Sequence, residues 1–506
     1  MKHALLLLLL IFPCRFIGMD NPQLAKAGII GLLSGVVFAQ GWPRVSFAGL
    51  LGVMGGVVVL WLLFCVSLGS PYVSTHTLWF IGNWGRVEGW AVMFCTFTVG
   101  ALWWSKMDVS EGMVTLVGVL VVFVVFVVVT LVGWGWVWLL PTVGTKYGVA
   151  ALLCVVVPVL FVALLDAPMR GKGLWRVLGA IVCAFIIIPL SGCRAACVAM
   201  VAGMVVASVM ACRGGKDWPF FWIFGIAVAM VCLFAVPGVR ERIHLPTFQG
   251  ARADIARQVF HHGLTFFGQG LESQIGLLNQ WEIRNGEVAR YDKMHCWPVD
   301  VLACGGVVGL ALILLILWFV GRVAWRNRGE WHVRACAGGL TAFLVFALWN
   351  PPTPQVWVLA AICAFGILSS EPEEHPIFAL PCIMGLCVGS FLCAVFIWKM
   401  CVGDMMNHHA QRALERGSAP HNVIGLQEMA VRFNPWLRGP MMLNVHNLAQ
   451  TRRLIELEAM RPMFMRELKA DDPMYEMRAY WWLYGAGNEG RSRQAMALAE
   501  WERSGR

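Results

Sequence analysis

The stretch Val114-Thr-Leu-Val-Gly-Val-Leu-Val-Val-Phe-Val-Val-Phe-Val-Val-Val-Thr-Leu131 decides the fold class of this chain. It has no charged residue, and its polar and apolar side chains do not alternate as they do in a strand with one wet face. A helix needs about 20 consecutive apolar residues to cross the hydrocarbon of a bilayer. Because every backbone amide in lipid must find its partner inside its own segment, we expect a membrane-spanning helix here and no barrel.

The composition extends this conclusion to most of the chain. Of its 506 residues, 59% are hydrophobic and 13% are charged, whereas soluble proteins carry about 25% charged residues. Most of the 17 cysteines lie inside apolar runs, where cysteine behaves as a small hydrophobe, so we expect no disulfide framework. The net charge of +10 is spread over loops. Membrane topology explains such a distribution, and we expect no nucleic-acid partner.

The sequence predicts an all-α polytopic membrane protein with about thirteen transmembrane helices. The first segment could be a signal peptide, but it has no clear small-residue cleavage site and another apolar segment follows from Ala27, so we interpret it as a short membrane helix. The thirteen predicted segments are 4–18, 27–40, 47–69, 87–104, 113–139, 148–165, 174–190, 195–212, 218–236, 298–320, 333–350, 355–369 and 378–400.

Basic residues in the short loops predict the orientation, because cytoplasmic loops are enriched in Lys and Arg. With the N-terminus inside, twelve lie on the cytoplasmic side: Lys2, Arg44, Lys106, Arg170, Lys172, Arg176, Arg213, Lys216, Arg322, Arg326, Arg328 and Arg334. Four lie on the other side: Lys26, Arg86, Lys146 and Arg194. We therefore expect a multi-pass protein of a bacterial inner membrane with a cytoplasmic N-terminus and a periplasmic C-terminus.

Two long stretches are predicted to lie outside the membrane. One is the periplasmic loop 237–296 of a membrane domain that covers residues 1–400. The other is a soluble C-terminal domain, 401–506, in which small and apolar residues recur at helical spacing. This tail predicts paired helices in a tetratricopeptide-like stack: Met405 to Arg416, Val423 to Phe433, Met442 to Glu458, Pro473 to Gly485 and Gly490 to Arg503.

In this topology three arginines and a histidine fall on the periplasmic face. Arg86 begins the fourth segment, Arg194 lies in the tight turn between the seventh and eighth, and Arg252 is in the long loop. His295 ends that loop. An arginine at the membrane needs a partner or a function. The alternatives are that Arg86 and Arg194 extend to lipid headgroups and that His295 caps its helix.

Arg252 is predicted to face inward on an amphipathic helix of the long loop. Ile255, Ala256 and Val259 follow it at spacings of three, four and seven residues and share its face. An inward guanidinium requires an anion, and a lipid-linked pyrophosphate would supply oxygens that a planar guanidinium binds in pairs. The alternative partner is a structural carboxylate such as Glu241 or Glu272.

The sequence favours neither a metal nor another cofactor. The histidine pairs 261–262 and 408–409 are adjacent in sequence, and adjacent side chains diverge on a helix, which makes chelation of one ion improbable. The first outward loop has no Asp-x-Asp pair. We expect chemistry that is independent of metal.

The stretch Met294-His295-Cys-Trp-Pro-Val-Asp-Val-Leu-Ala-Cys-Gly-Gly306-Val-Val-Gly309 resembles the signature of the O-antigen ligase superfamily. That family has a histidine at the end of its large periplasmic loop and glycines eleven and fourteen residues later. Three further segments resemble family elements in the same order, and together they cover about residues 75 to 320: Gly82 to Gly89, Ser191-Gly-Cys-Arg194-Ala-Ala, and Arg252-Ala-Asp-Ile-Ala-Arg-Gln-Val-Phe with Phe267-Gly-Gln-Gly-Leu271.

The chain departs from the family pattern at three positions. Cys296 stands where the family usually has Asn, and Cys304 where an acidic residue is common. Phe267 replaces the usual Pro before the Gly-x-Gly turn. The departures bear on the identity of the substrate more than on the class of reaction, since the arginines and the histidine remain.

The resemblance implies a glycosyltransferase that moves a glycan from undecaprenyl pyrophosphate to an acceptor hydroxyl at the periplasmic face. It implies that Arg194 and Arg252, assisted by Arg86, bind the pyrophosphate, and that His295 acts as general base in an inverting displacement. The resemblance implies that the acceptor is Ser or Thr of a pilin-like protein, or lipid A core. The alternatives are an O-antigen polymerase and, in another class, a transporter of lipid-linked glycan.

Overall fold

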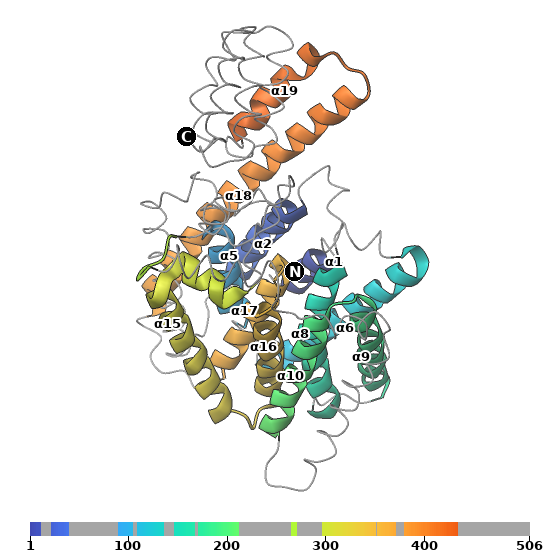
Figure 1. Cartoon of the computed structure of the whole chain (residues 1–506), viewed down its shortest axis with the longest axis vertical. Helices are drawn as coiled ribbons and strands as arrows, with labels where there is room; N and C mark the ends of the chain where they lie inside the picture. The colour runs from blue at the N-terminus through green and yellow to red at the C-terminus, as the bar shows by residue number, and fades with distance from the viewer. Residues whose placement is uncertain are drawn as a thin grey trace, which may run out of the picture.

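The computed structural model describes residues 1–11, 22–39, 90–104, 109–135, 146–166, 171–211, 265–270, 296–350, 352–370 and 379–433. All regular secondary structure within these residues is helical, and they contain no strand (Figure 1). The prediction of an all-α fold is confirmed for this part of the chain. The helices are α1 (Lys2–Ile11), α2 (Pro22–Ala39), α5 (Trp90–Trp103), α6 (Val109–Trp134), α8 (Lys146–Asp166), α9 (Lys172–Leu190), α10 (Arg194–Ala211), α15 (Trp297–Arg326), α16 (Trp331–Ala347), α17 (Pro354–Leu368), α18 (Ala379–Glu415) and α19 (Pro420–Phe433).

Six of these helices are long and apolar enough to cross a membrane, namely α6, α8, α9, α10, α15 and α18. Helices α1, α2, α5, α16 and α17 are apolar but shorter. The membrane-protein character is thereby supported. The number of thirteen crossings stays a prediction, because the predicted segments 47–69 and 218–236 lie outside the described residues.

Helices α8, α10 and α16 form the centre of the bundle and approach one another closely at two glycines. A Cβ atom on Gly203 of α10 would stand 2.5 Å from the carbonyl oxygen of Gly338 on α16 and 2.7 Å from Pro158 Cγ on α8. In lipid, helices gain from close packing, and small residues permit it. Helices α10 and α16 therefore meet backbone to backbone, and the side chain of Pro158 on α8 packs against this contact.

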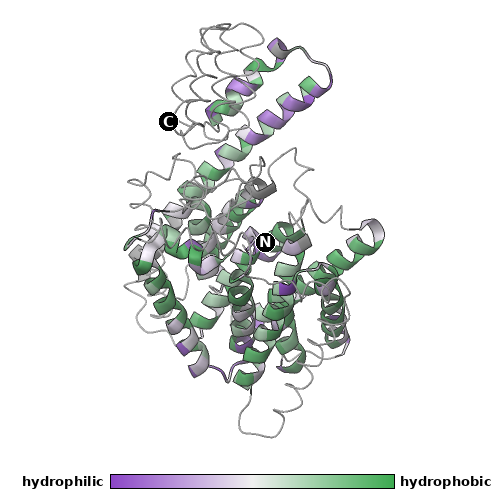
Figure 2. Ribbon diagram, in the orientation of Figure 1, coloured by the Kyte–Doolittle hydropathy of each residue, from purple (hydrophilic) through white to green (hydrophobic). Residues whose placement is uncertain are grey.

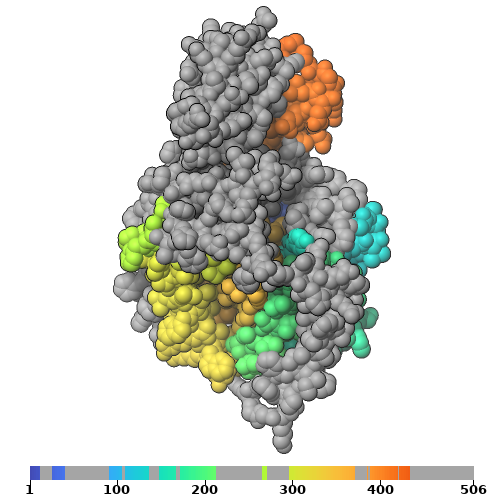
Figure 3. Space-filling view, in the orientation of Figure 1, coloured from blue at the N-terminus to red at the C-terminus, as the bar shows by residue number. Residues whose placement is uncertain are grey.

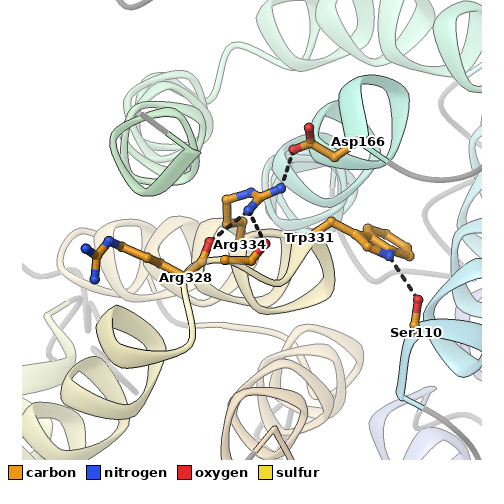
Figure 4. Close-up of polar contacts among 6 residues, drawn as sticks. Ser110, Asp166, Arg328, Trp331 and Arg334 are labelled. Carbon is orange, nitrogen blue, oxygen red and sulfur yellow. Dashed lines mark hydrogen bonds and ion pairs between the residues drawn. The ribbon is translucent and has the colours of Figure 1, made fainter. Parts of the chain in front are cut away.

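Polar contacts at one end of the bundle join α6, α8, α15, α16 and α17, and we call it the Arg334 end. Arg334 Nη2 lies 2.8 Å from Asp166 Oδ2, which links the start of α16 to the end of α8 (Figure 4). Trp331 Nε1 donates to Ser110 Oγ at 3.0 Å (Figure 4). Asn327 Nδ2 lies 3.0 Å from Ser370 Oγ. The first residues of α6 and α16 and the last residues of α8, α15 and α17 share this end.

The other end of these helices contains the turn between α9 and α10, and we call it the Asn350 end. Asn350 Nδ2 is 3.8 Å from Cys193 Sγ, so the residues after α16 contact the residues before α10. The rings of Trp297 and Trp357 lie 6.1 Å apart, centroid to centroid, which brings the start of α15 beside the first turns of α17. Helices α10, α15 and α17 therefore all begin at the Asn350 end.

Two lysines are buried in the N-terminal part of the bundle, and backbone carbonyls accept their hydrogen bonds. Lys26 Nζ donates to the Leu9 carbonyl at 2.7 Å, and Lys2 Nζ donates to the Trp103 carbonyl. Both side chains are almost inaccessible. A buried ammonium group needs such acceptors, because an unsatisfied charge in an apolar environment is costly.

Helix α18 corrects one prediction about the tail. We expected a membrane segment that ends at 400 and a separate helix from Met405, whereas α18 is continuous over 37 residues. Its length of about 55 Å exceeds a bilayer core, and Figure 1 shows it running past the bundle on the side opposite the α15–α16 turn. Figure 2 shows its character changing from hydrophobic to hydrophilic along that course.

Helix α19 folds back against the last part of α18, so the described part of the tail is a helical hairpin (Figure 1). Its bounds match the predicted helix from Val423 to Phe433 within a few residues. The predicted boundary after residue 400 falls inside α18. The three further helices predicted after 433, and with them the tetratricopeptide-like stack, lie outside the described residues.

Candidate functional site

The turn before Arg194 is closed by local hydrogen bonds at the Asn350 end. Ser191 Oγ donates to the Ile188 carbonyl at 2.6 Å and accepts from the Cys193 amide at 3.1 Å. Gly192 has a φ of 73°, a conformation that glycine adopts without a Cβ penalty. The predicted tight turn between the two helices is confirmed, and Ser191 and Gly192 fix its geometry.

This turn makes Arg194 the first residue of α10, where its side chain is half-buried. The N-terminus of a helix carries a partial positive charge that adds to the charge of the guanidinium. The combination is suited to an anion such as a phosphate. Of the four predicted site residues, Arg194 is the one within the described residues; Arg86, Arg252 and His295 lie outside them.

Helix α15 is interrupted at Gly306, which has a φ of 63° and a ψ of −162°. We expected a single helix over 298–320. The break instead leaves a first part, 297–305, and a second part, 307–326, that run in different directions (Figure 1). The second part has 20 residues and a length of about 30 Å, which matches the hydrocarbon thickness of a bilayer. The break therefore falls where a membrane crossing would begin.

The segment Thr265–Gly270 forms hydrogen bonds with both sides of this break, and we call the whole arrangement the glycine clasp. Gln269 N donates to the Ala303 carbonyl at 2.9 Å, and Gly270 N to the Cys304 carbonyl at 2.8 Å. In the opposite direction, the amides of 307 and 308 donate to the carbonyls of 265 and 266, at 3.4 and 3.1 Å. Helix ends leave such groups without partners, and the clasp satisfies them on both sides.

Two glycines make this approach possible. A Cβ on Gly306 would stand 2.3 Å from Gly268 N and 2.4 Å from the Thr265 carbonyl oxygen. A Cβ on Gly268 would stand 2.3 Å from the Cys304 carbonyl oxygen. Both residues also have positive φ, which side chains disfavour. At both positions, any other residue would collide with backbone atoms and be strained.

The glycine clasp joins two segments that lie far apart in the sequence. Gly268 belongs to the Gly-x-Gly turn of the long loop, and Gly306 to the stretch that follows His295. The sequence did not predict that they meet, nor that Gly306 breaks the helix. The signal available was the pair Gly305-Gly306 in an apolar run, because adjacent glycines weaken a helix.

The hydrogen bonds of the clasp give it a structural role, because they occupy the amides of 307 and 308 at the start of the second part of α15. These two N–H groups, which would otherwise attract a negative ligand, already donate to carbonyls of the loop. Of the departures from the family pattern, Cys304 belongs to the clasp and Cys296 lies at the start of α15. Cys296 is the N-cap of α15 and its carbonyl accepts from the Val299 and Asp300 amides, while Cys304 is buried and contributes its carbonyl to the clasp.

The described residues contain no group of three or more His, Cys, Asp and Glu side chains arranged to hold a metal ion. Eleven cysteines whose side chains the structure describes are free thiols. Compared with known proteins, the chain matches no family model. It also matches no curated protein.

Proposed function

We propose that this chain transfers a glycan from undecaprenyl pyrophosphate to an acceptor hydroxyl, without a metal and with inversion at the anomeric carbon. The observation that carries the proposal is the convergence at one end of the bundle. The Arg194 turn lies at the Asn350 end. The residue that follows His295 is the N-cap of α15, which starts at the same end.

The chemistry requires stabilisation of charge on the leaving group. The acceptor oxygen forms a bond to the anomeric carbon while the bond from that carbon to the pyrophosphate oxygen breaks. Undecaprenyl pyrophosphate leaves with the electron pair, and the hydroxyl proton passes to His295 as general base. Arg194 and Arg252, with Arg86, stabilise the negative charge that develops on the pyrophosphate. No nucleotide or metal takes part in this step.

The distribution of charge supports surface chemistry over transport. A transporter places charged groups near the middle of its helices, around a central path. In α6 and α8 the charged residues are Glu111, Lys146 and Asp166, and all three lie within three residues of a helix end. The described turns of the Arg334 end are rich in basic residues, which favours a cytoplasmic location for that end and a periplasmic one for Arg194: Lys172, Arg176, Arg322, Arg326, Arg328 and Arg334.

The proposal also concerns the molecule that accepts the glycan, and the position of the described α18–α19 hairpin helps to choose among the candidate acceptors. The hairpin extends from the bundle on the side opposite the α15–α16 turn (Figure 1), which is the side of the Asn350 end. A helical domain beside the site favours a protein acceptor such as a pilin-like substrate, because helical repeats present concave surfaces to peptides. Lipid A core is the second acceptor, and a growing glycan, as in an O-antigen polymerase, is the third.

Transfer by the purified protein tests this proposal directly. Undecaprenyl-pyrophosphate glycan is supplied with a pilin-type protein and with lipid A core in parallel reactions, and product is measured for wild type, Arg194→Ala and Arg176→Ala. Arg176 is an exposed arginine at the opposite end and serves as the control. We expect Arg194→Ala to lose at least about 100-fold in rate and Arg176→Ala to match wild type. Equal rates in all three proteins, or no turnover of the donor by any, would overturn the proposal; glycan polymer as the product would indicate a polymerase.

A further inference from the structure

The second part of α15 presents a stripe of exposed apolar side chains. Leu314, Leu315 and Trp318 are 55%, 58% and 59% exposed, and they lie at spacings that place them on one helix face. In the most apolar 18-residue stretch of each helix, 28% of α15 is buried, against 89% of α8. Figure 3 shows α15 forming an open part of the molecular surface. In a bilayer this stripe faces lipid tails.

Two arginine–tryptophan pairs stand at the end of this stripe. The guanidinium carbon of Arg322 lies over the ring of Trp318 at 5.6 Å, and that of Arg328 lies over the ring of Trp325 at 4.8 Å. Arg328 Nη1 also donates to the Trp325 carbonyl at 2.8 Å. Trp318 and Trp325 are both more than half exposed. Each cation is thus held against an indole face, an attraction that grows when water is excluded.

The depth of these pairs in a membrane follows from the length of the helix. If the crossing begins after the break at Gly306, the 20 residues to Arg326 extend about 30 Å and reach the opposite interface. Tryptophan is enriched at that level, and arginine reaches the headgroups there. Arg322 and Arg328 are therefore at the depth of lipid phosphates, with Leu314 and Leu315 at the depth of acyl chains.

Arg322 differs from the neighbouring Arg334 in its exposure and in its lack of an acidic partner among the described residues. Arg334 is 11% exposed and paired with Asp166 (Figure 4). Arg322 is exposed, and among the described residues no carboxylate lies within ion-pair distance of it. The run from Arg322 to Gly329 contains three arginines and no acidic residue. An anion is the ligand that such a group recognises.

We propose that Arg322, Arg328 and their two tryptophans bind an anionic phospholipid of the cytoplasmic leaflet, such as phosphatidylglycerol. The phosphate is bound between the guanidinium groups, and an acyl chain lies along Trp318, Leu315 and Leu314. This site is at the Arg334 end, whereas the proposed pyrophosphate site at Arg194 is at the Asn350 end. The inference is therefore independent of the glycan-transfer proposal and is tested without substrate.

Lipid retention measured by native mass spectrometry tests the site. The full-length protein is equilibrated with detergent micelles that contain equal amounts of phosphatidylglycerol and phosphatidylcholine, and the bound lipids are counted. The variant Arg322→Gln/Arg328→Gln removes both guanidinium groups. The control Arg412→Gln/Arg416→Gln removes two exposed arginines from the end of α18 and the turn after it, so the two proteins have equal net charge.

We expect wild type and control to retain phosphatidylglycerol preferentially. The double variant should bind it about 25-fold more weakly, because each basic residue near an anionic surface contributes about fivefold. Arg322→Gln alone is the second variant, since the hydrogen bond of Arg328 to the Trp325 carbonyl stays intact. It should give about a fivefold loss and keeps the test valid if the double variant misfolds. Equal retention by variant and control would overturn the proposal, as would equal binding of phosphatidylcholine by wild type.

Discussion

Gly268 and Gly306 lie backbone against backbone, although 37 residues separate them in sequence. The nitrogen of Gly268 occupies the space into which a Cβ of Gly306 would project, 2.3 Å from that position. Four hydrogen bonds surround this contact and connect the loop to both parts of α15. Because His295 is two residues before Trp297, the first residue of α15, the contact ties the Gly-x-Gly turn to the helix that follows the proposed base.

Replacement of Gly306 by alanine should disrupt this contact. The added Cβ collides with backbone atoms of Gly268, Thr265 and Phe266 at 2.3 to 2.5 Å, and alanine is strained at a φ of 63°. We expect a loss of about 2–4 kcal/mol in the free energy of unfolding, measured by thermal unfolding in detergent. If the proposed function holds, the rate of glycan transfer falls with it.

Gly309 provides the matched control for that substitution. It lies three residues further along α15, is buried, and has no heavy atom within 4 Å of a Cβ placed on it. Gly309→Ala should be neutral or stabilise α15 by up to about 1 kcal/mol, because alanine favours helix. Equal effects of the two substitutions would show that the clasp is not formed in the folded protein.

The two partners of the ion pair at the Arg334 end should differ in how much they stabilise the protein, and replacement of Arg334 should cost more than replacement of Asp166. Arg334 donates to Asp166 and also to the carbonyls of Arg328 and Gly329, each at 2.8 Å (Figure 4). Arg334→Ala removes three hydrogen bonds from a largely buried group and should cost about 2–3 kcal/mol. Asp166→Asn removes only a charge from a side chain that is one-third exposed, and should cost at most about 1 kcal/mol.

Unfolding temperatures of the two single variants and of the double variant measure this difference. The unfolding temperature of the double variant should be close to that of Arg334→Ala alone, because Asp166 stabilises the protein through its contact with Arg334. A larger effect of Asp166→Asn than of Arg334→Ala would contradict the geometry in Figure 4.

Close packing at the centre of the bundle predicts strong sensitivity at Gly203. A Cβ there would stand 2.5 Å from the Gly338 carbonyl oxygen, so α10 must move away from α16. We expect Gly203→Ala to cost about 2–3 kcal/mol, a typical penalty for overpacking. Gly35→Ala on α2, where a Cβ meets nothing within 4 Å, should be tolerated. The measurement is the yield of monodisperse protein together with its unfolding temperature, and a Gly203→Ala protein as stable as wild type would refute the packing.

Replacement of Gln427 on α19 by an apolar residue should stabilise the folded protein. Its side chain is fully buried, and neither amide atom has a hydrogen-bond partner within the part of the chain that the structure describes. A buried amide without partners costs about 1–3 kcal/mol, so Gln427→Met, which keeps the length and removes the polar atoms, should raise the unfolding temperature. Gln427→Glu places a charge at the same position and should lower it. Destabilisation by methionine would mean that the amide has a partner in the folded protein, such as a bound ligand.

Much of the helical architecture could be predicted from the sequence because its signal is local. A run such as 114–131 has no polar group to satisfy outside itself, so lipid solvation and backbone hydrogen bonding within the segment suffice to make α6 a helix. The turn at Ser191 and Gly192 was also predictable, since its hydrogen bonds join neighbours in the chain. The position of Arg194 at the start of α10 follows from that turn.

Other features required contacts between residues far apart in sequence. The continuity of α18 beyond 400 was missed, because the change from apolar to polar residues indicates where a helix leaves the membrane and does not require it to end there. The break at Gly306 was missed for the opposite reason: an apolar run with glycines is compatible with an unbroken helix until another segment supplies partners for the freed backbone groups.

The sequence by itself determined that this protein is helical, apolar over most of its length and basic on one set of loops, because each of these properties depends on side chains and their near neighbours. Tertiary structure alone decided that Gly268 meets Gly306, that Arg334 pairs with Asp166 and that α8 is enclosed by α10 and α16. These contacts bring together backbone and side-chain groups that are 38 to 180 positions apart in the sequence. Their energy depends on distances of a few ångströms, which no local pattern of residues specifies.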